Sequence, residues 1–193
     1  MPTSALGLVL GTAFAAGLNV YATVATLGLL HRFHAITLPE ALQPLAHPVV
    51  LGLALLLYVV EFFADKIPAI DHLWDAVHTF IRPPAAAMLA FAAVANVDEP
   101  WRLGAALLAG TVALASHGGK ATSRVAVNAS PEPFSTWLVS LGEDALAIAL
   151  TWLAATHPVL AIALAVVLTI AAVWVVVILV RLARRVVGRL GTA

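Results

Sequence analysis

Acidic and basic side chains recur at helical spacing between residues 65 and 82. Asp71, Asp75, His78 and Arg82 stand at positions i, i+4, i+7 and i+11, which form one face of a helix. The pattern predicts an amphipathic helix with two open interpretations. The first is an interfacial helix with a solvated polar face. The second is a helix that forms part of a charged site, which is favoured by the fact that an anionic lipid surface repels carboxylates. The apolar residues that fill the opposite face are Ile70, Leu73, Trp74, Val77 and Ile81.

A second stripe of the same spacing is cationic. His117, Lys120, Arg124 and Asn128 stand at i, i+3, i+7 and i+11. One interpretation is that Lys and Arg reach up to the headgroups of the cytoplasmic leaflet. The other is that this stripe pairs with the acidic one, since each stripe alone would be costly at membrane depth.

Two adjacent acids, Glu143 and Asp144, lie inside an apolar run that begins near Ser135. They are therefore about 12 Å along the helix axis. A charge at this depth costs at least about 2.5 kcal/mol unless it is paired or hydrated. The acids either form a structural ion pair with Lys120 or Arg124, or they are the innermost part of a functional site.

Taken together, the candidate ion-binding and substrate-binding residues carry both signs of charge. A cation bridged to carboxylates beside a basic pocket suits a metal–phosphate pair or a proton relay. Mg²⁺ or another divalent cation would take oxygen ligands, for which Asp71, Asp75, Glu143 and Asp144 are the candidates. The full set is Glu61, Asp65, Lys66, Asp71, Asp75, His78, Arg82, His117, Lys120, Arg124, Asn128, Glu132, Glu143 and Asp144.

Polar residues also interrupt the first apolar run, where Asn19 and Tyr21 follow Gly17. An asparagine in hydrocarbon usually hydrogen-bonds a neighbouring helix, and we expect helix packing here. The alternative is a helix that breaks near Gly17 and lines a pathway.

The elements that position these residues must lie in a membrane. The chain has 193 residues, of which 62% are hydrophobic and 10% charged, with a mean hydropathy of +1.01. A soluble domain is about 45–50% apolar and about 25% charged. We predict one all-α transmembrane domain over residues 1–180 and a basic cytoplasmic tail over 181–193. The lipid bilayer is the main partner, nucleic acid is disfavoured, and the absence of Cys excludes disulfides and thiolate sites.

The apolar runs predict about six transmembrane helices, with five spans plus a re-entrant segment as the alternative. Ten Lys and Arg are present, and an even span number places eight of them on the side of the C-terminal arginines. Both termini are then cytoplasmic, in a plasma (inner) membrane. The predicted runs are 4–30, 47–64, 83–97, 103–119, 135–156 and 158–180.

A faint internal repeat accompanies this count. Gly11-Thr12 recurs as Gly110-Thr111, and His47-Pro48-Val49 recurs as His157-Pro158-Val159 at a slightly larger offset. With three spans in each half, the halves would be inverted, an arrangement common among transporters.

Three blocks of the sequence resemble a family of small bacterial membrane proteins, domain of unknown function 4126. The most specific part is Asp65-Lys66-Ile67-Pro68 together with Trp74-Asp75. The resemblance covers nearly the whole chain except the basic tail, and it implies a membrane protein without implying an activity. The blocks are residues 17–23, 61–83 and 117–144.

Three functions follow as hypotheses. The first is a small transporter or channel with a cytoplasm-facing site for an ion or a small charged or phosphorylated solute. The second is a metal-dependent membrane enzyme acting on a phosphorylated lipid. The third is a non-catalytic scaffold. Side chains of Asp71 and Asp75 that face bulk water would favour this hypothesis. The sequence leaves a homo-oligomer open.

Overall fold

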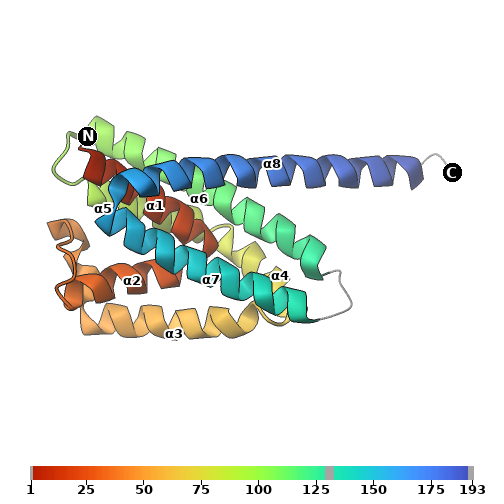
Figure 1. Ribbon diagram of the computed structural model, residues 1–193, viewed down its shortest axis with the longest axis horizontal. Coiled ribbons are helices and arrows are strands. Elements are labelled where there is room, and N and C mark those ends of the chain that lie inside the picture. Colours follow the sequence, from red (N-terminus) through yellow and green to blue (C-terminus); the bar gives the residue numbers. More distant parts are fainter. Residues whose placement is uncertain (1, 129–132, 191–193) are drawn as a thin grey trace.

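Helices make up almost the entire computed structural model, which describes residues 2–128 and 133–190 (Figure 1). No strand occurs in these two ranges. The all-α prediction is therefore confirmed. The elements are α1 (Thr3–Leu18), α2 (Val20–Arg32), the 3-10 helix η1 (Glu40–Ala46), α3 (Pro48–Ala64), α4 (Pro68–His78), α5 (Arg82–Ala93), α6 (Glu99–Asn128), α7 (Pro133–Thr156) and α8 (Pro158–Leu190).

The first apolar run is broken at Asn19, which separates α1 from α2. Asn19 has an extended backbone, with φ −152° and ψ 101°. Its side-chain oxygen accepts a hydrogen bond of 2.9 Å from the Ala22 amide, so it caps α2. The same residue thus ends one helix and begins the next.

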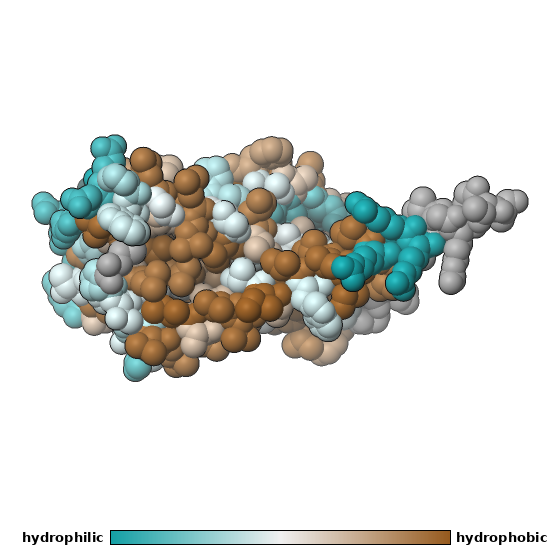
Figure 2. All heavy atoms as spheres, turned by 90° about the horizontal axis from the view of Figure 1, so that it is seen from above, coloured by the Kyte–Doolittle hydropathy of each residue, from teal (hydrophilic) through white to brown (hydrophobic). Residues whose placement is uncertain are grey.

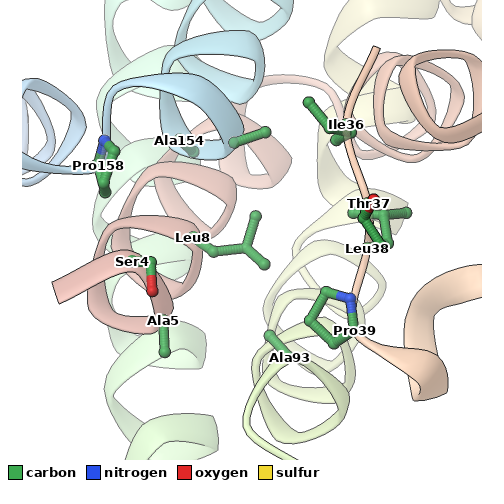
Figure 3. A pocket seen from close by; sticks show the side chains of 11 residues that line it. Ser4, Ala5, Leu8, Ile36, Thr37, Leu38, Pro39, Ala93, Ala154 and Pro158 are labelled. Carbon is green, nitrogen blue, oxygen red and sulfur yellow. The ribbon is translucent and has the colours of Figure 1, made fainter. Parts of the chain in front are cut away.

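The chain turns back at this break. Ser4 and Ala5 of α1 line one cavity together with Thr37 and Leu38, which follow α2 (Figure 3). The outer ends of α1 and α2 therefore lie at the same end of the molecule, and the two form a helical hairpin. Hence the prediction of one continuous span over 4–30 is wrong, because capping by Asn19 lets the chain reverse inside the protein.

The hairpin also determines at which end of the molecule α1 begins. The start of α1 and the C-terminal end of α8 lie at opposite ends of the longest axis (Figure 1). This arrangement does not confirm an even number of crossings or the placement of both termini on one side. The basic segment from Arg181 continues α8 as a helix up to Leu190.

Two helices, Phe134–Thr156 in α7 and Pro158–Arg185 in α8, are long and apolar enough to cross a membrane. A third crossing results if η1 and α3, which meet at 66°, count as one bent span. Together, α4 and α5 return the chain to the end of the molecule at which α3 begins (Figure 1). Neither six spans nor inverted halves are confirmed.

Small residues allow close contact between these helices. A Cβ atom on Gly17 would lie 2.5 Å from the Ala113 carbonyl oxygen of α6. A Cβ atom on Gly119 would lie 2.8 Å from the Ala172 side chain of α8. Glycine at these positions brings α1 and α8 onto α6, as small residues do between transmembrane helices.

The outer surface of the bundle is apolar. Brown apolar side chains cover its middle and teal hydrophilic ones lie toward both ends on the face in Figure 2. Leu107 is 75% exposed, and almost all of α8 is outside the protein core. An apolar belt of this kind needs lipid around it, which supports the membrane prediction.

Candidate functional site

The acidic face of α4 points into the protein. Asp71, Asp75, His78 and Arg82 are all at most 4% exposed. The apolar face is the exposed one, with Leu73 at 68%. The predicted amphipathic helix is confirmed, but its polar face is not solvated, because the partners of these side chains lie in the bundle and lipid can cover the apolar face.

Those partners include the cationic stripe of α6, so the expected approach of the two stripes is confirmed. Arg124 Nη1 lies 3.8 Å from Asp71 Oδ1. The Asn128 amide donates to Asp71 Oδ2 at 2.6 Å. His117 Nε2 contacts the Asp75 carbonyl oxygen at 3.0 Å.

Arg82 holds one end of the charged cluster. Its Nη2 donates to Glu61 Oε1 at 2.8 Å, and its Nη1 lies 3.4 Å from Asp75 Oδ1. Its Nη1 also contacts His117 Nδ1 at 2.6 Å. Because a guanidinium only donates, His117 Nδ1 is an acceptor in this contact.

Lys120 and Arg124 share the carboxylates in the centre. Lys120 Nζ lies 2.7 Å from Asp65 Oδ2, 3.6 Å from Glu61 Oε1 and 3.8 Å from Glu143 Oε2. Arg124 Nη2 lies 3.1 Å from Asp65 Oδ2 and 2.6 Å from Glu143 Oε2. The expected pairing of Glu143 with these two cations is therefore confirmed.

The same cations also satisfy the broken end of α1. Arg82 Nη1 donates to the Gly17 carbonyl at 3.3 Å, and Lys120 Nζ donates to the Leu18 carbonyl at 3.3 Å. The last carbonyls of a helix have no partner within it and carry partial negative charge. The break at Asn19 is thus tied directly to the charged cluster.

Asp144 differs from the other buried acids. It is 4% exposed, and its Oδ1 accepts a hydrogen bond of 2.9 Å from the Asn19 amide. Within residues 2–128 and 133–190, no Lys, Arg or His nitrogen lies within 4.0 Å of its carboxylate. Its Oδ2 is buried without a hydrogen-bond partner.

The charged cluster contains more carboxylate oxygens than hydrogen-bond donors to satisfy them. Six acids face the four bases Lys66, Arg82, Lys120 and Arg124, which leaves a net charge of −2 with His neutral. Buried polar atoms normally have partners, so leftover acceptors indicate a missing donor or cation. The buried carboxylate atoms without a hydrogen bond are Glu61 Oε2, Asp65 Oδ1, Asp71 Oδ1, Asp75 Oδ2 and Asp144 Oδ2.

The remaining predicted residues lie around this cluster. Lys66 donates to the Phe62 carbonyl at 2.8 Å and lies 3.4 Å from Ser140 Oγ. Tyr21 contacts His78 Nε2 through its hydroxyl at 3.1 Å. Glu132 lies outside the described residues.

Sequence reasoning missed the uncharged members of the site. Thr136 contacts the Asn128 amide oxygen at 3.2 Å, and both Thr136 and Ser140 are buried. With Asp144 they stand at i, i+4 and i+8, a helical spacing that could have revealed one polar face of α7. Thr79 was also missed and contacts His117 Nε2 at 2.9 Å.

The metal hypothesis gains no geometric support. In the described part of the chain, no three His, Asp or Glu residues are arranged to hold a metal ion. Arg124 separates Asp71 from Glu143, and Asp144 faces Asn19 instead. Because carboxylates already engage Arg82, Lys120 and Arg124, these cations do not form an open phosphate pocket.

No curated protein and no solved structure matches the chain. A family model, described as Domain of unknown function (DUF4126), matches residues 6–177. The match includes the helix break and every described member of the charged cluster, and the chain belongs to the DUF4126 family.

Proposed function

We propose that this protein is a small membrane transporter that carries a proton or another small cation on Asp144. The observation behind the proposal is the position of this carboxylate. It is buried among apolar helices, bonded to a neutral amide, and lacks a basic nitrogen within 4.0 Å in the described ranges. An unpaired charge in such a place is costly, so a proton or a cation must neutralise it.

The net charge of the cluster supports the same proposal. Six acids and four bases leave an excess of two negative charges within the cluster, although the whole chain is neutral. Removing charges from water is costly unless they are balanced. A bound proton or monovalent cation would balance part of this excess and use carboxylate oxygens that have no donor.

The helix break supports transport rather than a purely structural cluster. Transporters often place ion sites where two half-helices meet inside the membrane. Here the α1 carbonyls of Gly17 and Leu18 and the α2 cap Asn19 meet the charged residues. A movement of this hairpin would change the surroundings of Asp144 directly.

For the orientation, we propose five crossings plus the α1–α2 hairpin. Arg181, Arg184 and Arg185 are exposed near the end of α8, and positive residues favour the cytoplasmic side. The C-terminal end is then cytoplasmic and α1 begins outside the plasma membrane. The cation site would open toward the cytoplasm, near the ends of α3, α4 and α6.

Infrared spectroscopy can test cation binding at Asp144. If Asp144 binds a proton, a pH titration of the purified protein should show the carbonyl stretch of a protonated carboxylic acid. If it binds Na⁺, this stretch should disappear when Na⁺ replaces choline at fixed ionic strength. Asp144→Asn should lack that signal. Glu99→Gln is the matched control, because Glu99 is exposed at the start of α6.

Flux measurements complete the test. Proteoliposomes with a trapped pH dye should take up protons, or radioactive Na⁺, under an imposed membrane potential, and Asp144→Asn should abolish this uptake while Glu99→Gln should not. A signal of wild-type size in Asp144→Asn in both assays would show that Asp144 is not the cation-carrying group.

A further inference from the structure

A cavity lies beside the charged cluster, between α8 and the helices α1, α6 and α7. Its volume is about 220 Å³. It includes Lys120 and Glu143 from the cluster and is otherwise mainly apolar. Part of its lining belongs to α8, which extends past the rest of the bundle (Figure 1) and whose outer side chains are exposed, with Trp174 at 65%. The cavity is therefore at the lipid-facing side of the protein.

The polar end of this cavity is a carboxylate. The Glu143 side chain is 12% exposed, whereas those of Glu61, Asp65 and Lys120 are at most 1% exposed. The Glu143 Oε2 atom accepts from Arg124 Nη2 at 2.6 Å and lies 3.8 Å from Lys120 Nζ, so a ligand would meet the other carboxylate oxygen, Oε1. Glu143 is thus the member of the charged cluster that an incoming ligand would meet first.

The hydroxyl groups near the cavity are already engaged. Ser116 donates to the Phe14 carbonyl at 2.8 Å, and Ser123 donates to the Lys120 carbonyl at 2.8 Å. They are not free to donate to a phosphate. With the net negative charge of the cluster, this favours a positively charged ligand over an anionic one.

The walls of the cavity are mainly apolar and come from four helices, including α1 through Phe14 and Leu18. They include Leu146 of α7 and Leu168, Ala171 and Val175 of α8. An apolar site with one charged group selects a ligand with an apolar body and one opposite charge. A volume of about 220 Å³ fits a headgroup and the first part of a tail, while the rest of the tail would remain in lipid.

We infer that this cavity binds hydrophobic cations, which are amines or quaternary ammonium compounds with an apolar tail, and that they enter from the bilayer. The inference rests on the proposed function, because it names the solute that the transporter moves against the cation on Asp144. The ammonium group would lie at Glu143 and the tail along α8.

Binding can be measured with radiolabelled decyltrimethylammonium and protein in lipid nanodiscs, with empty nanodiscs subtracted. Tetramethylammonium has the same head without a tail, and decyl sulfate has the same tail with an anionic head. We expect saturable binding that unlabelled decyltrimethylammonium competes away and the other two do not. Competition by decyl sulfate at equal concentration would overturn the inference.

Two variants separate charge from shape. Glu143→Gln should weaken binding about tenfold or more, because it removes the charged partner of the headgroup. Ala171→Phe fills the cavity without changing any charge and should weaken binding as well. Ala163→Phe is the matched control, since Ala163 is exposed on α8 and does not line the cavity. Wild-type binding in Ala171→Phe would overturn the inference even if Glu143→Gln fails to fold.

The two proposals can fail separately. Cation-dependent signals from Asp144 without any decyltrimethylammonium binding would refute the cavity and leave the transporter proposal standing. The opposite outcome has two parts: Ala171→Phe abolishes specific binding, and Asp144→Asn behaves as wild type in the cation assays. That outcome would support the cavity and refute the role of Asp144.

Discussion

The Asp144 carboxylate of α7 accepts a hydrogen bond of 2.9 Å from the Asn19 amide, at the point where α1 ends and α2 begins. The two residues are 125 positions apart in the chain. Asn19 uses its other side-chain atom to cap α2. One side chain therefore connects the helix break to the buried acid on which the proposed function depends.

Replacing Asn19 tests this connection. Asn19→Ala removes the cap of α2 and the donor to Asp144, so we expect a loss of about 2 kcal/mol in the free energy of unfolding. Thermal unfolding in detergent, followed by circular dichroism, measures it. Asn96→Ala is the control because Asn96 is exposed, and an equal loss in both variants would contradict the structural role of Asn19.

Two acids of the cluster should respond differently to neutralisation. Asp65→Asn leaves Lys120 and Arg124 without their shared carboxylate, and breaking a buried pair costs about 3–5 kcal/mol. Asp144→Asn removes a charge that has no basic nitrogen within 4.0 Å in the described residues, so its cost should stay below about 1 kcal/mol or the variant should be more stable. Unfolding temperatures of the two purified variants decide this, and a larger loss for Asp144→Asn would mean that Asp144 is paired.

Close packing at the hairpin predicts a contrast between two glycines. Gly17→Ala places a Cβ 2.5 Å from the Ala113 carbonyl oxygen and should destabilise the protein by about 1–3 kcal/mol. Gly52→Ala meets nothing within 4 Å and should be neutral or slightly stabilising, because alanine favours a helix. Both are measured by thermal unfolding, and equal stabilities would show that α1 does not approach α6 so closely.

Cysteine labelling tests the hairpin topology, and the sequence contains no Cys that would react in the background. Thr3→Cys and Glu99→Cys should react with a membrane-impermeant maleimide in intact cells, because the hairpin places both outside. Arg185→Cys should react only after permeabilisation. All three positions are suitable because their side chains are exposed. Protection of Thr3→Cys together with Arg185→Cys would instead support a continuous first span with both termini inside.

Local patterns were enough to identify the membrane class and most of the charged cluster. Composition required a lipid environment, and the helical spacing from Asp71 to Arg82 and from His117 to Asn128 defined two stripes. Opposite charges at membrane depth are stable only as pairs, which is why the approach of Asp71 to Arg124 could be expected without a structure.

The path of the chain could not be predicted in the same way. A helix breaks at Asn19 only if other groups satisfy its open ends. Arg82 of α5 and Lys120 of α6 donate to the last carbonyls of α1, and Asp144 of α7 accepts from the Asn19 side chain that caps α2. An apolar run of this length is equally compatible with one crossing or a hairpin, because both bury the same side chains. Tertiary structure alone decided that the chain turns back after α1 and that, among the described residues, no basic nitrogen lies within 4.0 Å of the Asp144 carboxylate, since both depend on contacts between residues distant in sequence.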